Sequence, residues 1–310
     1  MSQFNQTTAN ILMVRPGAFG FNAETAVSNN YQMKLDMELS DLQKKAHDEF
    51  DAFVDRLRQA KVNVMVFQSP MDPVTPDAVF PNNWIRIGHG GKIDLFPMLA
   101  KNRRLERNQD LVTDLHEQFE IESVSDGLLE FEEKDQFLEG TGSIVFDHPR
   151  KRAYACISPR THKDLFERYC QHIGYEAISF VAKRSDGQLQ YHTNVVLAIG
   201  TKVVMGDFER FESKADRDKV ESTLSENLKL IHLSGDQVEK SFCGNAIELL
   251  NTSGESVWVM STTSWEAFSK DQQDLLSQDS HIVRAPLDVI EKVGGGSARC
   301  MIAEIFADLK

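Results

Sequence analysis

Cys300 lies at the end of a glycine-rich turn, residues 294–299, and directly before an apolar segment at 301–306. Three consecutive glycines allow backbone conformations that other residues avoid, and they let the main chain come close to a bound ligand. The apolar segment is typical of a short buried strand. A thiol placed by a flexible turn can act as a nucleophile, but a free cysteine is more often a small buried hydrophobic residue. The position of Cys300 alone therefore leaves both roles open.

Polar residues able to support such chemistry precede other apolar segments of the chain. His192 carries an imidazole that could serve as a base for a thiol and later as an acid. Glu139, followed by a cramped glycine-containing turn, could orient that imidazole or hold a nitrogen of a substrate. The carboxamides of Asn83 and Asn194 present both a donor and an acceptor to a planar polar group. Together with Cys300, these residue types fit covalent catalysis by a thiolate.

Each of these residues also has an ordinary structural explanation. Glu139 could be an exposed carboxylate at the end of a strand, and one histidine among nine is more often structural or solvated than catalytic. Asn82 and Asn83 are typical of a turn. His148, beside a proline in a hairpin turn, is predicted to lie on the surface. Arg299 could lower the pKa of the neighbouring thiol or point into solvent. The arrangement of the elements has to decide between these explanations.

The elements that must position these residues recur along the chain. Pairs of apolar strands joined by a turn begin near positions 80, 138, 192 and 243, and a last strand follows the cysteine. Their starts lie roughly 50–57 residues apart, within the range of repeat architectures. A strand at 11–14, an amphipathic helix at 40–61 capped by Ser40, and a strand at 62–67 complete the first unit. Further helices are predicted at 108–119, 161–173 and 214–227, and from 264 or 269 to 276.

Five hairpin, helix and strand units predict an α/β fold in which the modules close into a ring without exposed sheet edges. A generic open α/β sheet is the alternative. In a pseudo-symmetric ring, equivalent strand starts converge on one axis. The polar residues that precede the strands would then line a single central cavity: Asn82, Asn83, Glu139, His192, Asn194, Asn245 and Cys300.

The composition excludes several classes of function. At 310 residues and 41 % hydrophobic, the chain can bury a large core. Its formal charge of −13 disfavours binding to nucleic acid. The four cysteines form neither a CxxC pair nor a zinc-ligand spacing. No secretory signal and no membrane-spanning apolar run is visible. These features predict a cytoplasmic protein with reduced thiols and without a membrane or nucleic-acid partner.

Several motifs resemble those of the guanidine-modifying, or amidinotransferase (pentein), superfamily, which includes arginine deiminase, dimethylarginine dimethylaminohydrolase and glycine amidinotransferase. Within it, the sequence is most similar to the citrulline-utilisation hydrolases. The resemblance extends over residues 13–306 and implies a single catalytic domain, 1–310, built as a five-module pseudo-symmetric α/β propeller. It also implies a catalytic set of Cys300, His192 and Glu139, without a metal or cofactor. The motifs that carry it are at 15–25, 80–84, 138–143, 191–194 and 294–300.

The sequence departs from the deiminases of this superfamily at two positions. Asn83 and Asn194 stand where those enzymes use two aspartates to hold a cationic guanidinium. Amides favour a neutral group with one C=O in place of an NH₂, such as the ureido group of citrulline. The resemblance and this departure imply hydrolysis of citrulline to ornithine, CO₂ and ammonia through a covalent adduct on Cys300. An amide pair could also accept a guanidinium held by Glu139 alone, so arginine remains open as a substrate.

The remaining expectations concern ligands and partners. Asn82 and Asn22 are expected to contribute to substrate binding, and the segment 22–32 is expected to close over the amino-acid end of the substrate. Deimination or two-step hydrolysis of arginine or another guanidino compound is the second candidate function. A non-catalytic pentein that binds a partner is the third, although such a protein has no need of the Cys, His and Glu set. A homo-oligomer is compatible with the sequence.

Overall fold

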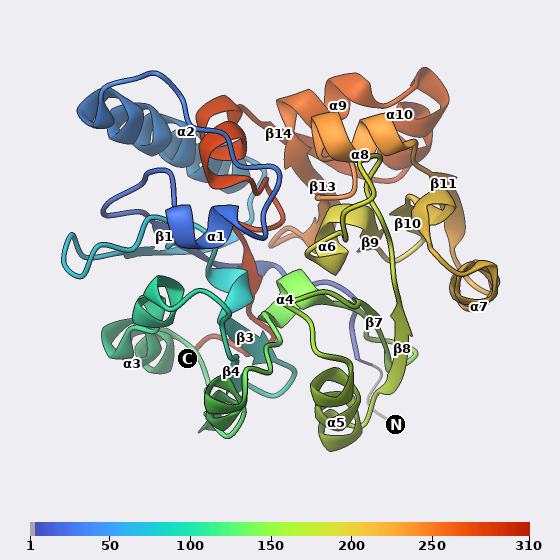
Figure 1. Cartoon of the computed structure of the whole chain (residues 1–310), viewed down its shortest axis with the longest axis horizontal. Helices are drawn as coiled ribbons and strands as arrows, with labels where there is room; N and C mark the ends of the chain where they lie inside the picture. The colour runs from blue at the N-terminus through green and yellow to red at the C-terminus, as the bar shows by residue number, and fades with distance from the viewer. Residues whose placement is uncertain (1–3) are drawn as a thin grey trace.

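Residues 4–310, which the computed structural model describes, form five small sheets of three strands each around a common centre (Figure 1). In every sheet, the middle strand pairs antiparallel with one neighbour and parallel with the other, which follows a helix. The strands are, sheet by sheet, β15 (Ala303–Glu304), β1 (Asn10–Arg15) and β2 (Asn63–Gln68); β3 (Ile85–Gly88), β4 (Lys92–Leu95) and β5 (Ser123–Ser125); β6 (Ile144–Asp147), β7 (Arg152–Cys156) and β8 (Glu176–Phe180); β9 (Leu197–Ile199), β10 (Val203–Gly206) and β11 (Lys229–His232); β12 (Ile247–Leu250), β13 (Ser256–Ser261) and β14 (His281–Ala285).

The ring is closed by the two ends of the chain. β1 pairs parallel with β2, and its other edge pairs antiparallel with β15, the last strand. The strand that follows Cys300 therefore completes the first module, as the sequence predicts. The five-module α/β propeller is confirmed, and the alternative of one open sheet is wrong.

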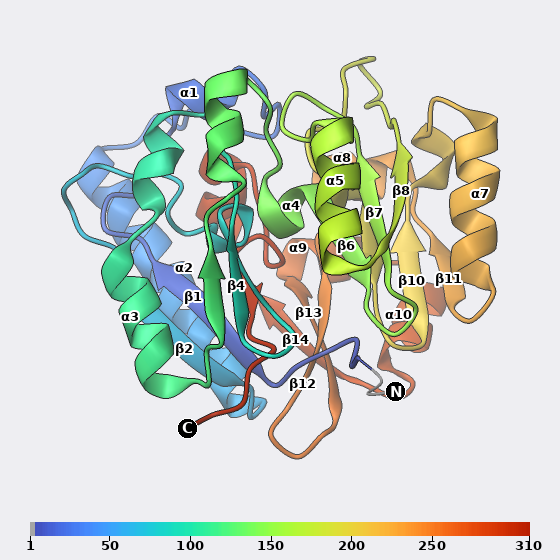
Figure 2. The same ribbon diagram turned by 90° about the horizontal axis from the view of Figure 1, so that it is seen from below.

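Helices cross from the hairpin to the third strand of each module and cover the outside of the ring (Figures 1 and 2). The second of them, α3, begins after Asn108, whose side chain accepts a hydrogen bond from the backbone N–H of Asp110. The crossing helices are α2 (Leu39–Gln59), α3 (Gln109–Gln118), α5 (Lys163–Ile173), α7 (Lys214–Ser225), and α9 (Thr262–Ala267) with α10 (Lys270–Ser277). None of the helices described within residues 4–310 is both long and apolar enough to cross a membrane.

The amphipathic pattern of α2 explains its packing. Ala46, Phe50, Phe53 and Leu57 recur at helical spacing and are at most 1 % exposed in the core. Burying each phenylalanine contributes roughly 1.5–3 kcal/mol to folding. The prediction of Ser40 as the cap is wrong, because α2 already begins at Leu39 and no side-chain cap is formed.

The polar residues at the strand starts lie on short helical turns that the sequence did not predict. Strands were expected from positions 80, 138 and 192, but one turn of helix precedes each strand. Gly140 in the second turn has a φ of +48°, and a Cβ there would lie 2.3 Å from the carbonyl oxygen of Asn82. This glycine lets two modules touch at the axis. The turns are η1 (Pro81–Asn83), α4 (Gly140–Ser143) and α6 (Thr193–Val196).

Other short helices lie in the connections between these elements. The most relevant is α1, which begins after Asn22 and lies over the centre of the ring (Figure 1). The short helices are α1 (Ala23–Ala26), η2 (Asn102–Glu106), η3 (Leu129–Lys134), η4 (Phe208–Arg210), α8 (Gly235–Ser241) and η5 (Ile290–Gly294).

The prediction that His148 lies on the surface is wrong. Its side chain is 3 % exposed, and its ring stacks on Phe146 with the ring centroids 5.1 Å apart. Nδ1 is hydrogen-bonded to the hydroxyl of Tyr175 at 2.8 Å. Burial lowers the pKa of His148 well below its ordinary value, so the ring is neutral. The adjacent Pro149 is exposed, but Tyr175 and Phe306, from distant parts of the chain, pack around the ring together with Phe146.

Candidate active site

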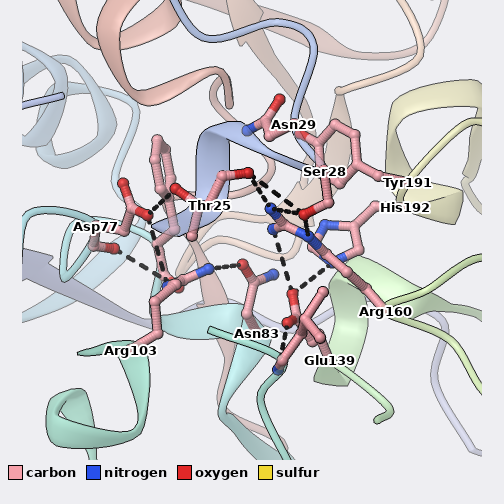
Figure 3. Close-up of polar contacts among 12 residues, drawn as sticks. Thr25, Ser28, Asn29, Asp77, Asn83, Arg103, Glu139, Arg160, Tyr191 and His192 are labelled. Atoms are coloured by element: carbon pink, nitrogen blue, oxygen red, sulfur yellow. Dashed lines mark hydrogen bonds and ion pairs between the residues drawn. The ribbon is translucent and has the colours of Figure 1, made fainter. Parts of the chain in front are cut away.

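The helical turns at the strand starts bring Glu139 and His192 into direct contact at the centre of the ring (Figure 3). Oε2 of Glu139 lies 2.8 Å from Nε2 of His192, and the two residues are at most 1 % exposed. The other carboxylate oxygen accepts the backbone N–H of Leu99 at 3.1 Å. Nη1 of Arg160 lies 3.4 Å from Oε2. The carboxylate is therefore held by three groups on different segments.

Burial and charge assign opposite protonation states to this pair. Burial raises the pKa of Glu139, but the charge of Arg160 and the hydrogen bond to His192 outweigh it, and the pKa falls to about 2. Burial lowers the pKa of His192 to about 4, against the influence of Glu139. At neutral pH an ionised carboxylate thus faces a neutral imidazole, which must carry its proton on Nε2 to donate to it. Nδ1 is left as an acceptor and can act as a base.

The surroundings of His192 leave room only for glycine at position 142. A Cβ there would lie 2.8 Å from Nδ1 of His192 and 2.5 Å from Nδ2 of Asn83. The free nitrogen of the imidazole and the amide of Asn83 are therefore neighbours across this glycine. This is the close approach for which the sequence suggested a glycine-containing turn.

Two carboxamides surround the thiol of Cys300. Sγ accepts from Nδ2 of Asn245 at 3.1 Å and from Nδ2 of Asn194 at 3.5 Å. Burial raises the pKa of the thiol, while the hydrogen bonds from Asn245 and Asn194 lower it in part. Cys156, by comparison, is equally buried and lacks a side-chain amide donor; burial raises its pKa to about 12, although a backbone hydrogen bond from Ala182 lowers it in part. The two side-chain amides thus give the thiolate of Cys300 a stabilisation that Cys156 lacks.

Arg299, the neighbour of the thiol, does not point into solvent. Its Nη2 lies 2.9 Å from Oε2 of Glu304, and Nη1 donates to the carbonyl of Ile302. Its charge lowers the pKa of Cys300, as one of the two alternatives proposed, but it is the smallest of the contributions. The salt bridge to Glu304 leaves little of the charge to act on the thiol.

The glycines before Cys300 are required by close packing. Cβ atoms at Gly294 and Gly296 would lie 2.8 and 2.9 Å from the ring of Phe80, and Gly295 has a φ of +65°. Ser297 donates to Oε1 of Glu291 at 2.5 Å and so ties the turn to η5. The turn that delivers the thiol is therefore fixed by packing in this structure.

Asn83 is oriented by an arginine that the sequence analysis missed. Nη1 of Arg103 donates to Oδ1 of Asn83 at 2.6 Å (Figure 3). Because a guanidinium only donates, the amide oxygen must face Arg103 and Nδ2 must face away. That nitrogen donates to Oδ1 of Asn82 at 3.0 Å and has a second hydrogen to offer. Arg103 itself is held by Glu106, three residues later, and this spacing on a short helix was the only signal for it in the sequence.

Asn194 has the complementary arrangement. Its Nδ2 points to Sγ of Cys300, and its Oδ1 is buried without a hydrogen-bond partner among residues 4–310. A buried acceptor without a partner costs stability, which is typical of a functional site. Asn194 therefore offers an acceptor where Asn83 offers a donor.

Helix α1 and the loop after it cover these residues. Arg160 donates to the carbonyl of Thr25 at 3.0 Å and to Oγ of Ser28 at 2.9 Å (Figure 3). Asn29 donates to the carbonyl of Gly295 at 3.2 Å. Since the candidate residues are at most 3 % exposed, part of the protein must move before a substrate can reach them, and this segment is in direct contact with the site. Arg160 was also missed, because only the folded chain brings it to Glu139.

Asn22 lies at the edge of the site. It caps α1 by accepting the N–H of Glu24, and its amide nitrogen donates to Oδ2 of Asp77 at 2.8 Å. Its recorded hydrogen bonds do not reach Cys300, His192 or Glu139. The second oxygen of Asp77 is buried without a partner among the described residues. Asp77, like Arg160, had no signal in the sequence analysis.

Within residues 4–310, no group of three or more His, Cys, Asp or Glu side chains is placed to hold a metal ion. The site consists of a thiol with two amide donors, a neutral imidazole on an ionised carboxylate, and buried guanidinium groups. Such a set can perform nucleophilic attack with proton transfer.

The chain is similar to known proteins in fold and in sequence. Comparison with curated proteins gave no match. Among solved structures, the N-terminal domain of ArgZ, a cyanobacterial arginine dihydrolase bound to its substrate, superposes with a TM-score of 0.72, 16 % identity, and coverage of 96 % of this chain and 99 % of that domain. AgrE with L-arginine gives a TM-score of 0.74 at 16 % identity, and the match covers 96 % of this chain but 40 % of AgrE. The adduct of a dimethylarginine dimethylaminohydrolase with 4-chloro-2-hydroxymethylpyridine gives a TM-score of 0.62 at 15 % identity, and the match covers 96 % of this chain and 100 % of that chain.

These structural similarities establish the shared fold. The sequence itself, from residue 15 to residue 307, matches the family described as N,N dimethylarginine dimethylhydrolase, eukaryotic. Because this match covers nearly the whole chain, the protein belongs to that family, within the pentein or amidinotransferase superfamily, and is a hydrolase acting on C–N bonds.

Proposed function

We propose that the protein hydrolyses citrulline to ornithine, CO₂ and ammonia, with Cys300 as the nucleophile. The observation that carries this proposal is the fixed pair of amides at the site. Nδ2 of Asn83 is a donor because Arg103 holds its oxygen, and Oδ1 of Asn194 is an acceptor without a partner. A ureido group has one C=O to accept and N–H groups to donate, and so it matches both.

A guanidinium fits the same pair less well. It carries only N–H donors, so Nδ2 of Asn83 would face a donor. Turning the Asn83 amide over would place its nitrogen against the guanidinium of Arg103 and lose a bond of 2.6 Å. A buried donor facing a donor costs about 1–3 kcal/mol. The neutral substrate is therefore favoured.

In the first half of the reaction, Sγ of Cys300 attacks the ureido carbon and the thiol proton passes to Nδ1 of His192. The amides of Asn245 and Asn194 stabilise the thiolate. The bond from the ureido carbon to the terminal nitrogen breaks, and that nitrogen takes the proton from His192 and leaves as ammonia. The product is an S-carbamoyl adduct that still carries the ornithine nitrogen. Glu139 orients the imidazole and stabilises its transient positive charge.

In the second half, His192 removes a proton from water, and the hydroxide attacks the carbonyl carbon of the adduct. The C–S bond breaks, the thiolate of Cys300 takes the proton back, and a carbamate of ornithine is released. The carbamate loses CO₂ and gains a proton on nitrogen to give ornithine. The sum is one citrulline and one water to one ornithine, one CO₂ and one ammonia.

The amino-acid end of the substrate would be held beneath α1. The guanidinium of Arg160 lies beside Glu139 and can bind a carboxylate once its bonds to Ser28 and Thr25 are exchanged. The unpartnered oxygen of Asp77 can accept from the α-ammonium group. Asn22 and Asn82 would then act by orienting Asp77 and Asn83, respectively.

Two-step hydrolysis of arginine is the second candidate. The specific observation in its favour is the similarity of the fold to an arginine dihydrolase and to AgrE with bound L-arginine. The unpartnered oxygen of Asn194 and the carboxylate of Glu139 would then hold the guanidinium. This reaction would release two molecules of ammonia for each ornithine.

The test is to incubate the protein with citrulline and with arginine in parallel and to measure ammonia and ornithine. We expect one ammonia per ornithine from citrulline, and no turnover of citrulline by Cys300→Ser. Cys170→Ala, which changes a buried cysteine of another module, serves as the matched control and should retain activity. Ammonia from arginine with none from citrulline would establish the second candidate instead. Near-normal turnover by Cys300→Ser would exclude covalent catalysis by this residue.

A further inference from the structure

A second cavity lies at the far end of the hairpin that begins next to Asn83. Its volume is about 300 Å³, and it is lined by Arg86, Gly88, His89 and Tyr175, among others. β3 leads from the catalytic end to this cavity, and its four residues, Ile85–Gly88, span roughly 10 Å. The cavity therefore does not belong to the candidate active site. Its volume lies at the lower limit of pockets that hold small molecules.

The floor of this cavity is the guanidinium of Arg86, a side chain that is 9 % exposed. Its Nη1 donates to Oδ2 of Asp94 at 2.9 Å and to the hydroxyl of Tyr169 at 3.2 Å. Among residues 4–310, the structure records no hydrogen bond from Nε or Nη2. These two atoms form the side-on edge with which an arginine binds a carboxylate in bidentate fashion. The group lies flat against Gly88, where a Cβ would be 2.6 Å from Nη1.

Asp94 supplies an acceptor beside this edge. It lies directly opposite Arg86 in the antiparallel register of β3 and β4. Its Oδ2 accepts from Arg86 and from the hydroxyl of Tyr169 at 2.6 Å. No partner of Oδ1 is recorded among the described residues. A free donor edge and a free acceptor oxygen, fixed side by side, match the carboxylate and the ammonium group of an α-amino acid.

The remaining lining selects the side chain of such a ligand. Lys92 and His172 line the cavity and are exposed, so they stand where the cavity meets solvent. Lys92 lies 3.5 Å from Oε1 of Glu122 in a pair whose side chains are both more than half exposed, so the pair is weak and the ammonium of Lys92 can still attract an acidic side chain and repel a cationic one. His89 and Tyr175 add apolar faces for the methylene groups of the ligand.

We propose that this cavity binds a free α-amino acid with an acidic side chain, held by Arg86 through its carboxylate and by Asp94 through its ammonium group. The site is separate from the substrate site and does not depend on which compound is hydrolysed.

The position of the cavity gives it a route to regulate catalysis. Arg86 lies on the strand that begins two residues after Asn83. Asp94 lies on β4, which leads to Leu99, whose N–H holds Glu139. A ligand that shifts these strands would move one group that binds the substrate and one that positions His192. Any such coupling is reciprocal, so substrate would alter the affinity for the amino acid by the same factor.

Binding of L-glutamate to the full chain can be measured by calorimetry. We expect one site per chain, with glutarate, which lacks the ammonium group, and L-lysine each bound at least about tenfold more weakly. Arg86→Lys keeps the charge but loses the side-on edge, and should weaken glutamate binding by a similar factor. Lys92→Glu reverses an exposed charge at the mouth and should also weaken it. Lys163→Glu, an equally exposed charge reversal on α5, is the matched control and should bind as the unaltered protein does.

Arg160→Lys alters the proposed substrate site and should leave glutamate binding unchanged, so this inference and the proposed function fail independently. Thermal unfolding of each variant shows whether lost binding comes from lost folding, and the exposed Lys92→Glu keeps the test decisive if Arg86→Lys does not fold. No binding of glutamate at millimolar concentration would overturn the proposal. Equal binding of glutarate and glutamate would overturn it as well, as would loss of binding in Arg160→Lys with none in Arg86→Lys.

Discussion

At the scale of single residues, the chemistry of the centre depends on what each polar atom has already bound. The amide oxygen of Asn83 already accepts a hydrogen bond from Arg103, whereas the amide nitrogen of Asn194 donates to the thiol of Cys300. The two amides therefore differ, although the sequence presents them as equivalent. Sequence spacing could predict that Glu139, His192 and Cys300 converge. It could not predict Arg103 and Arg160, because their contacts with Asn83 and Glu139 form only in the folded chain.

The orientation of Asn83 predicts the effect of a carboxylate at this position. Asn83→Asp removes the donor and provides acceptors, so kcat/KM for citrulline should fall by at least about tenfold relative to arginine. The ratio of the two specificity constants is the measurement. Asn227→Asp, the same charge change at an exposed position after α7, should leave the ratio unchanged. An unaltered ratio in Asn83→Asp would show that this residue does not select the substrate.

The hydrogen bonds of Asn245 predict that its replacement makes the thiol of Cys300 less reactive. Its Nδ2 lies 3.1 Å from Sγ of Cys300, and its oxygen accepts the N–H of Cys300 at 3.3 Å. Because this amide lowers the pKa of the thiol, Asn245→Ala should move the pH dependence of Cys300 alkylation to higher pH and lower kcat. Alkylation rates across a pH series, with labelling mapped by mass spectrometry, are the measurement. An unchanged profile would mean that Asn245 only supports the fold.

At the scale of elements, the repeat of hairpin and helix could be predicted from the sequence, whereas the helical turns before the strands could not. Apolar periodicity marks strands and long helices, but a single turn such as η1 or α4 is too short to carry a period. These turns depend on contacts across the axis, as at Gly140 against the backbone of Asn82. Helix α1 escaped notice for the same reason, since its four residues are held by Arg160 and Asp77.

The contacts of α1 predict that it limits access to the site. Ser28→Ala removes the hydroxyl that accepts two hydrogen bonds from Arg160, at 3.0 and 2.9 Å. In the unliganded protein the closed position should then be less populated, so a larger fraction is open to substrate and KM should fall several-fold with a smaller effect on kcat. Steady-state kinetics measure this split, and Ser222→Ala on the outside of α7 is the control. Hydrogen exchange at 22–32 should be slowed by ornithine, and exchange as slow as that of β1 without ligand would contradict a moving segment.

At the scale of the whole molecule, the same strand pairing closes the ring and fixes the position of the nucleophile. The turn that carries Cys300 leads within three residues into β15, which pairs with β1. The two ends of the chain thereby fix the thiol against modules formed by the middle of the sequence. This arrangement costs stability, because the centre of the ring buries three ionisable groups away from water: Glu139, Arg160 and His192.

These buried groups predict how stability depends on pH. Burial lowers the pKa of His192 and of His89 to about 4 and that of His148 further, so the unfolded chain binds protons near pH 6.5 that the folded chain does not. These imidazoles make stability fall as the pH drops from about 6.5 towards 4, whereas burial raises the pKa of Glu106 and Glu291 to about 7, so these carboxyls bind protons in the folded chain and oppose the fall. Below pH 4.5 stability is lost as Glu139, with a pKa of about 2, must be protonated. The midpoint of thermal unfolding across this range is the measurement. Compared with the unaltered protein, His192→Gln should lose less stability between pH 6.5 and 4, whereas His116→Gln on the exposed side of α3 should follow the unaltered protein. Identical pH profiles of His192→Gln and the unaltered protein would mean that folding does not lower the pKa of His192.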